Sequence, residues 1–361
     1  MSDTSSKKYT HTADQSTVQL AHGSGGSMMQ SLIRDVFADA FGDVQLDDAA
    51  TMAMQSSGAD SADTKISMST DSYVVQPLFF PGGDIGRLAI CGTVNDVATS
   101  GSLPRWISVS FILEEGFPIA DLRRIVRSMA DTAREAGVQI VTGDTKVVGK
   151  GHGDGVFINT TGVGVVPGGQ RILGDPEGRF APGDQILLSG SIGDHGMCIM
   201  SQREELSFAA DLHTDAAPLN AMMEAVLAAA PDTHCFRDPT RGGLASTLNE
   251  LADTGRVTMI VEERAVPVKP AVQGACEMLG YDVFQVANEG KIVAIVPANQ
   301  ADAALAAMQT SPYGANAAII GVIESCIERD EDVFAKVQLR NAFGALRVMD
   351  TLVGEQLPRI C

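Results

Sequence analysis

Three aspartates, Asp48, Asp71 and Asp96, have the side-chain type and the positions that could bind a metal ion. Asp48 precedes one short predicted strand and Asp71 lies within the next. Asp96 lies in a helix that is apolar on most of its circumference, where an unpaired carboxylate would be very costly. Carboxylate oxygens suit the hard cation Mg²⁺. The alternative is that Asp48 and Asp71 are ordinary carboxylates at strand ends, and without further signals that reading would be preferred.

Glycine-rich stretches in front of predicted helices are candidate anion sites. His22-Gly23-Ser24-Gly25-Gly26 leads into an amphipathic pattern, and its backbone N–H groups could hold a phosphate. A simple flexible entry to a helix is an equal alternative. The stretch Arg237-Asp238-Pro239-Thr240-Arg241-Gly242-Gly243 also precedes a helix, and its two arginines predict a phosphate or carboxylate site. Gly92, one turn before Asp96, leaves room for a ligand.

Polar residues also lie beside two predicted buried strands. Thr142-Gly143-Asp144-Thr145-Lys146 follows a short apolar strand at 138–141, and the carboxyl end of a strand is a common place for chemistry. Glu289, beside Gly290 at the mouth of the strand at 292–296, is a candidate acid or base. A solvated loop glutamate is the alternative.

The sequence finishes on a cysteine, Cys361, preceded by Leu357-Pro358-Arg359-Ile360. Apolar residues and a proline are more than an idle chain end needs, because such ends are usually frayed and solvated. The segment is therefore interpreted as a tether, rooted at Gly354, that carries a thiol into a pocket. The alternative is an end that happens to stop at cysteine.

Composition narrows the class of protein. The 361 residues carry a formal net charge of −19, which argues against binding to nucleic acid or anionic membranes. No run approaches the roughly 20 apolar residues of a membrane span. The six cysteines form no Cys-x-x-Cys motif, and residues 1–17 lack the apolar core of a secretion signal. We therefore expect a cytoplasmic protein with free thiols.

Hydrophobic patterns predict two units of mixed strands and helices without a fixed-period repeat. The expected order is a disordered extension at 1–17, an N-terminal domain at 18–170, a C-terminal domain at 171–350 and a flexible tail at 351–361. The clearest elements are an apolar helix at 85–98 capped by Asp84, a helix from Pro118 that stops at Gly137, and a strand at 156–166.

Eight motifs together resemble the HypE family of [NiFe]-hydrogenase maturation proteins, within the aminoimidazole ribonucleotide synthetase/selenophosphate synthetase superfamily. The resemblance covers residue 18 to the end, and the terminal Pro-Arg-Ile-Cys separates this family from the rest of the superfamily. The polar loop at 55–65 and Asp-Val-Phe-Gln at 282–285 depart from the family pattern. The motifs are His22–Gly26, Phe79–Gly86, Cys91–Asp96, Thr142–Val147, Ile192–Gly196, Arg237–Gly243, Ala287–Lys291 and Leu357–Cys361.

The resemblance implies a two-domain α+β fold of the aminoimidazole ribonucleotide synthetase type. Its N-terminal domain would pair with a second copy into a dimeric sheet or barrel, with ATP in the cleft, and its C-terminal domain would be an α/β sandwich. It also implies a reaction: a HypF carbamoyltransferase places a carbamoyl group on Cys361, and ATP drives its dehydration to an S-cyanide. The cyanide then passes to iron on a HypC–HypD complex.

Residue roles follow from matching the family's motifs to this sequence. Mg²⁺ would be held by Asp48, Asp71 and Asp96, with Asp144 as a possible fourth ligand. Catalytic roles would fall to Cys361, Glu289 as the base, Lys146 on developing charge, and His22. ATP would be bound by Gly23, Gly25, Gly26, Gly92, Thr93, Asn95, Thr142, Gly143, Asp144 and Arg241.

Two other classes of function stay open at this stage. A selenophosphate synthetase or a purine-pathway synthetase would share the ATP motifs, but neither explains Cys361, and the early reactive cysteine of the selenium enzyme is missing. A non-catalytic carrier would need only the terminal thiol. The many carboxylate and glycine motifs argue against a carrier, and ATP hydrolysis would distinguish the two.

Overall fold

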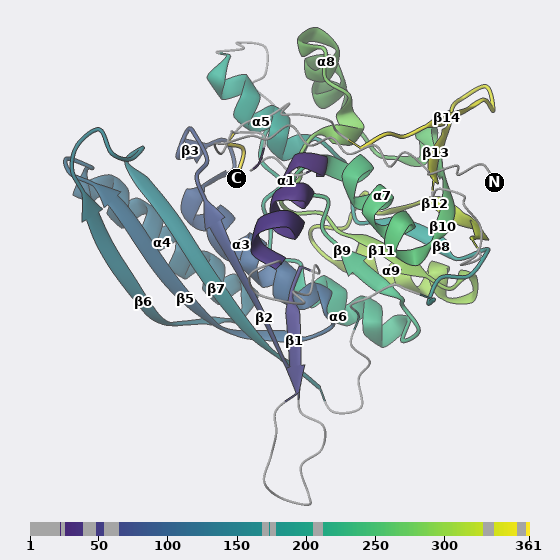
Figure 1. The fold of residues 1–361 in the computed structure, drawn as a ribbon, viewed down its shortest axis with the longest axis horizontal. Coiled ribbons are helices and arrows are strands. Elements are labelled where there is room, and N and C mark those ends of the chain that lie inside the picture. The colour runs from purple at the N-terminus through teal and green to yellow at the C-terminus, as the bar shows by residue number, and fades with distance from the viewer. Residues whose placement is uncertain are drawn as a thin grey trace, which may run out of the picture.

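The structure, a computed structural model, describes residues 22, 26–38, 48–53, 65–167, 173, 178–204, 212–327, 336–351 and 359–361. The expected disordered extension, Gly23, Gly25 and nearly all of the 55–65 loop lie outside the described residues. Two sheets organise the chain, one in each half (Figure 1). Within the described ranges, no helix combines the length and apolar character needed to cross a membrane.

The N-terminal half is built on a five-stranded sheet in the order β1-β2-β7-β5-β6, antiparallel except for the β5–β6 pair. Its elements are α1 (Gly26–Leu32), a π-helical turn (Ile33–Ala38), β1 (Ala50–Ala53), β2 (Lys65–Tyr73), β3 (Phe79–Phe80), β4 (Gly83–Asp84), α3 (Ile85–Thr99), β5 (Leu103–Glu114), α4 (Ile119–Ala136), β6 (Gln139–Val148) and β7 (Val156–Val166).

The C-terminal half is built on a seven-stranded sheet in the order β14-β13-β10-β12-β8-β11-β9, in which only β10 and β13 pair in parallel. Its elements are β8 (Gln185–Leu188), α5 (Asp194–Arg203), α6 (Asn220–Ala229), β9 (Cys235–Arg237), α7 (Gly243–Gly255), β10 (Val257–Glu262), α8 (Pro270–Leu279), β11 (Val293–Val296), α9 (Ala301–Thr310), β12 (Ala318–Cys326), β13 (Lys336–Arg340) and β14 (Leu346–Val348), with short 3₁₀ turns at Glu263–Ala265, Val283–Gln285 and Ala298–Gln300.

Helix α3 joins the two halves. It packs on β2 and β7 of its own sheet, and it also contacts α6 and β9 of the C-terminal half. This double contact explains why the helix is apolar around most of its circumference. The predicted cap is confirmed, because the Asp84 side chain accepts a hydrogen bond from the Arg87 amide at 2.9 Å. The predicted stop of α4 is confirmed as well, with Gly137 in the left-handed region at φ 72°.

The two faces of the N-terminal sheet differ. One face is covered by α3 and α4, and it carries buried residues such as Ser69, Tyr73 and Val109. The other face has no helix over it among the described residues. Because strand side chains alternate, this open face carries the intervening positions, including exposed Met68, Trp106 and Ile112.

The predicted end of the strand at 138–141 was wrong. Strand β6 runs from Gln139 to Val148, so the Thr142–Lys146 motif lies inside the strand instead of beyond it. Four short strands, β3, β4, β9 and β14, were not predicted. The five-stranded sheet of the N-terminal half forms no closed barrel within the described chain.

Candidate active site

Carboxylates from both halves converge beside α3, and we call this group of side chains, with Arg237, Arg241 and Glu289, the acidic cleft. Asp71 comes from the covered face of β2, Asp96 from α3, and Asp238 from the turn after β9. Burial raises the pKa of Asp96 well above its usual range, and the charges of Asp238, Asp48 and Asp71 raise it further. Burial likewise raises the pKa of Asp238 to about 8, with Asp48 and Asp71 adding to the effect.

Two arginines of the Arg237–Gly243 motif provide positive charge in this cleft. Arg237 forms an ion pair with Asp48 at 3.1 Å, and the Arg241 guanidinium lies 3.9 Å from Asp71. Ser69 on β2 donates a hydrogen bond to Asp96 at 2.9 Å. The cleft therefore holds more acidic than basic groups, which favours a cation as a further component.

Glu289 borders the same cleft, in the loop before β11. Its side chain is buried, and its Oε1 accepts no hydrogen bond from any described residue. Burial raises the pKa of Glu289 well above its usual range; the charges of Asp238, Asp71 and Asp215 act in the same direction, and Arg241 opposes them. Groups whose pKa is shifted by burial and by specific charged neighbours are typical of functional sites.

The backbone of Glu289 is held by a buried ion pair. Its amide donates to Asp215 Oδ1 at 3.0 Å, and the Lys291 ammonium lies 3.1 Å from Asp215 Oδ2. Burial raises the pKa of Asp215, but Lys291 and His195 outweigh that effect and the pKa is lowered. Asp215 is therefore a carboxylate that fixes the loop of Glu289.

The last residues of the chain lie near α5 and β3 (Figure 1) and bond to the backbone of the 74–76 segment. The backbone oxygen of Cys361 accepts a hydrogen bond from the Val74 amide at 3.0 Å. Burial raises the pKa of the Cys361 thiol to about 12; Arg241 opposes this shift, whereas Glu289, Asp71 and Asp238 add to it. The structure thus brings Cys361, Glu289 and the aspartates together, as the tether interpretation requires.

The carboxylates fit a nucleotide-bound cation better than a closed metal site. Among the described residues, no three His, Cys, Asp or Glu side chains are arranged to hold a metal ion by themselves. Mg²⁺ often takes only one or two protein carboxylates and completes its shell with phosphates and water. Mutual repulsion among Asp48, Asp71, Asp96 and Asp238, seen in the raised pKa values of Asp96 and Asp238, is what a divalent ion would relieve.

Asp144 and Lys146 are not part of this cluster within one chain. In the β5–β6 register they pair with Ser110 and Ile112, which lie on the open face of the sheet. Their side chains form an exposed ion pair at 2.6 Å, and the Lys146 hydrogen bond lowers the pKa of Asp144. Thr142 lies on the same face.

Four other predicted ligand-binding residues have packing partners inside the protein. A Cβ on Gly92 would meet the Tyr73 hydroxyl at 2.4 Å, so Tyr73 fills the space expected for a ligand. Thr93 is fully buried and hydrogen-bonds Thr160, while Asn95 links α3 to the backbone of Ala217 and Leu219. A Cβ on Gly143 would meet the Val109 oxygen at 2.2 Å, which ties this glycine to the close approach of β5.

Of the predicted phosphate-binding motif His22–Gly26, the structure describes only His22 and Gly26. His22 is half-buried, and Gly26 begins helix α1. Gln30 of α1 donates to Glu250 of α7 at 3.3 Å, so this helix lies against the C-terminal half.

Sequence reasoning missed three residues of this region. Asp238 lies in the motif already selected for its arginines, so its proximity to Arg237 was an available signal. His195 also lies in a selected motif, Ile192–Gly196, but its contact with the chain end depends on residues far away in sequence. Asp215 had no such signal, because its role depends on contacts with Glu289 and Lys291.

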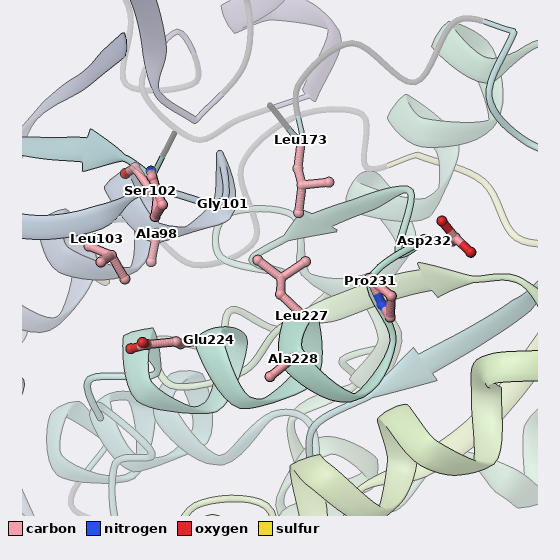
Figure 2. Close-up of a pocket in the computed structure, with 11 residues that line it drawn as sticks. Ala98, Gly101, Ser102, Leu103, Leu173, Glu224, Leu227, Ala228, Pro231 and Asp232 are labelled. Carbon is pink, nitrogen blue, oxygen red and sulfur yellow. The ribbon is translucent and has the colours of Figure 1, made fainter. Parts of the chain in front are cut away.

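Two cavities lie outside the acidic cleft. One has a volume of about 460 Å³ and lies between the end of α3 and α6. Figure 2 shows its lining residues, and none of those described is a predicted site residue. Another, of about 410 Å³, borders the Lys291–Asp215 pair and is also lined by Arg87, Asp194 and Lys269.

Sequence comparison gives the family. Residues 46–166 match the model of AIR synthase related protein, N-terminal domain, and residues 181–328 match that of its C-terminal domain. The carbamoyl dehydratase HypE of Azotobacter vinelandii is 54% identical over 345 residues, covering 96% of this chain and 97% of the relative. The chain belongs to the HypE family. The carbamoyl dehydratase HypE of Cupriavidus necator is 53% identical, with 95% of each chain covered.

Solved structures of the HypE family have the same fold. The hydrogenase maturation protein HypE in complex with ATP is 48% identical and superposes with a TM-score of 0.76. The match covers 96% of this chain and 100% of that one. The HypE chain of a HypE–HypF complex is 44% identical with a TM-score of 0.80, covering 89% of this chain and 100% of that one. The expected two-domain α+β fold of the superfamily is thereby confirmed.

Proposed function

We propose that this chain is an ATP-dependent carbamoyl dehydratase that converts an S-carboxamide on Cys361 into an S-cyanide for the iron of a [NiFe]-hydrogenase. The observation that carries the proposal is the position of Cys361, whose thiol shares the acidic cleft with Glu289 and Arg241. The relatives named carbamoyl dehydratase HypE, at about half sequence identity over almost the whole chain, support it.

The reaction begins by making the carboxamide oxygen a leaving group. The γ-phosphoryl group of ATP is transferred to that oxygen, giving ADP and an O-phosphorylated intermediate. Loss of both N–H protons and departure of phosphate then form the C≡N bond. The oxygen of the amide leaves in phosphate, so the net change is S-carboxamide plus ATP to S-cyanide, ADP, phosphate and a proton.

Glu289 is the proposed base for the N–H protons. Its position beside Cys361, with a buried oxygen that accepts no hydrogen bond from the described residues, suits proton transfer. The raised pKa of Glu289 makes it a stronger base once ionised, and Arg241 favours that ionised form. The Asp215–Lys291 pair keeps the loop in place during the reaction.

Asp48, Asp71 and Asp96 are the proposed Mg²⁺ ligands, and Asp238 joins them on the evidence of its location. A bound Mg²⁺ would neutralise charge on the ATP phosphates, which is the main requirement of phosphoryl transfer. Arg241 and the backbone at Gly26 are the proposed phosphate contacts. The solved HypE structure in complex with ATP supports nucleotide binding by this family.

A second copy of the chain is the proposed occupant of the open sheet face. That face carries exposed Met68, Trp106 and Ile112, and large apolar residues on an uncovered sheet typically mark an interface. It also carries Asp144, Lys146 and Thr142, which a single chain keeps away from Cys361. A homodimer would place these side chains near the partner's cleft.

The chemistry requires two protein partners. A carbamoyltransferase of the HypF type must load Cys361, and the HypE–HypF complex supports such a contact in the family. An iron-carrying complex of the HypC–HypD type must accept the cyanide.

Intact-mass measurement tests the activity. With HypF, a carbamoyl donor and ATP, the wild-type chain should gain a carbamoyl group on Cys361, and MgATP should then yield a product lighter by one water. Cys361→Ala should accept no carbamoyl group. The matched control Cys326→Ala, which removes another accessible thiol, should behave as wild type. A carbamoyl adduct on a cysteine other than Cys361 would contradict the proposal.

A further inference from the structure

The end of the chain is held by two side chains of one helix. His195 Nε2–H donates to the Ile360 carbonyl at 2.8 Å, and the Arg203 guanidinium donates to the Arg359 carbonyl. Both residues belong to α5 and are eight positions apart, which is about two helical turns. They therefore reach the tail from the same side of the helix.

The N-terminal half holds the opposite side of the tail. The Val74 and Gln76 amides donate to the backbone oxygens of Cys361 and Arg359 at 3.0 and 3.4 Å, in antiparallel order. Arg359 forms an ion pair with Asp154 at 2.6 Å. The Ile360 side chain is only 3% exposed and packs in the N-terminal core. Residues 359–361 therefore dock against the 74–76 segment through two backbone hydrogen bonds, and against the rest of the N-terminal half through one ion pair and one buried apolar side chain.

The hydrogen bonds around His195 define one protonation state. The Ile360 carbonyl can only accept, so His195 Nε2 must carry a proton, and in the neutral ring Nδ1 accepts from the Thr214 hydroxyl at 2.7 Å. Nδ1 is then the acceptor, and Nε2 carries the proton given to Ile360. Burial lowers the pKa of His195, so the neutral ring is also the favoured one.

We propose that His195 and Arg203 of α5 are positioning residues that hold the C-terminal segment in the acidic cleft, with Cys361 beside Glu289. The role of this docking in dehydration rests on the proposed function. The contacts that hold the segment do not depend on that function. Neither residue touches the reacting atoms: both act on the backbone of Arg359 and Ile360.

The Cys361 thiol reports directly on docking. In the docked tail the pKa of this thiol is about 12, so little thiolate exists at pH 8. An undocked thiol has a pKa of about 8.5 and reacts readily. Cys326 is the other accessible cysteine among the described residues, so a Cys326→Ser background makes Cys361 the reporter for a thiol reagent such as DTNB.

The experiment compares two substitutions of His195 in that background, without ATP or carbamoyl donor. His195→Phe removes the donor to Ile360. Because the loss of one buried hydrogen bond shifts the docking equilibrium by about tenfold, the Cys361 labelling rate should rise about tenfold. His195→Gln keeps an N–H near the Nε2 position and should stay near the wild-type rate. Arg203→Gln should also raise the rate, and the control Arg134→Gln on the exposed face of α4 should not.

A merely structural role predicts a different pattern. His195→Phe and Arg203→Gln would then lower the unfolding temperature while the Cys361 labelling rate stayed at the wild-type value, and that result would overturn the proposal. If His195→Phe does not fold, Thr214→Val, which removes the hydroxyl that orients the His195 ring at Nδ1, replaces it with a smaller expected increase in the labelling rate. If wild-type protein forms no S-cyanide, the proposed function fails, yet the labelling rates still decide the docking.

Discussion

The two faces of the N-terminal sheet carry the same residue types in opposite surroundings. On the covered face, Asp71 of β2 and Asp96 of α3 lie among other carboxylates, and burial with like charge raises the pKa of Asp96. On the open face, Asp144 is exposed beside Lys146, and its pKa is lowered by that partner. Position relative to α3, and not residue type, separates a buried carboxyl group with a raised pKa from an exposed one with a lowered pKa.

The contrast extends to the two Lys–Asp pairs. The Lys146–Asp144 pair is the shorter, at 2.6 Å, but its side chains are 70% and 60% exposed. The Lys291–Asp215 pair, at 3.1 Å, has side chains only 8% and 3% exposed. Water screens the first pair, whereas removal of one partner of the second would leave a buried charge. A ranking by distance alone would wrongly give the Lys146–Asp144 pair the larger contribution to stability.

The largest effect is expected at Glu289 on the covered side. Glu289→Gln keeps the size of the side chain but removes the base, so the dehydration rate should fall about 10²–10⁴-fold while ATP binding is retained. The carbamoylated chain should accumulate, which intact-mass measurement would detect.

Glu224→Gln is the matched control for that substitution. Glu224 is exposed on α6 and outside the acidic cleft, so its loss should leave the dehydration rate unchanged. Normal S-cyanide formation by Glu289→Gln would show that another group removes the protons.

The next effect concerns stability and compares the two Lys–Asp pairs. Lys291→Met strands the Asp215 carboxylate in the interior and should lower the free energy of unfolding by about 3 kcal/mol. Lys146→Met should leave the midpoint of denaturant unfolding where it is in wild type. Because its partners hold the pKa of Asp215 below the ordinary value, the stability that this pair contributes should be fully present above the unfolded-state pKa near 3.9. It should be lost as pH falls further, through the lowered folded-state pKa.

A double variant separates charge from packing. Lys291→Met with Asp215→Leu removes both charges, so it should be more stable than Lys291→Met alone. Equal destabilisation by the single and double variants would show that packing, and not the stranded carboxylate, is responsible.

Local signals in the sequence were enough for most elements of the fold. The apolar helix 85–98, its Asp84 cap and the Gly137 stop were predictable because they depend on residues close in sequence. The convergence of Cys361 and Glu289 was expected from the resemblance to the HypE family. The tail's tether interpretation needed no long-range information either, since a proline and apolar residues at a chain end are unusual.

Strand register could not be predicted in the same way. Thr142–Lys146 has few residues typical of strands, so the strand was expected to end there, but pairing with β5 carries it to Val148. A strand that continues assigns alternate residues to opposite faces, and Asp144 is thereby separated from Asp71. The roles of Asp215 and His195 depend on partners at least 74 residues away in sequence, which no local pattern reveals.

The smallest expected signal tests whether Lys146 works across a dimer. Lys146 lies on the open face and Glu289 on the cleft side of the same chain, so in a homodimer a site would combine Glu289 of one copy with Lys146 of the other. Lys146→Ala and Glu289→Gln should each be inactive alone. In a mixed dimer, one of the two sites escapes both substitutions.

With random pairing about half of the dimers are mixed, so co-expression of the two variants should restore about a quarter of the wild-type dehydration rate. Mixing the separately purified variants without subunit exchange should restore nothing, which provides the control. If Lys146 instead acted within its own chain, each mixed dimer would hold one site lacking the lysine and one lacking the base. The co-expressed protein would then be as inactive as the two single variants. That result would contradict a role of Lys146 in the partner's active site.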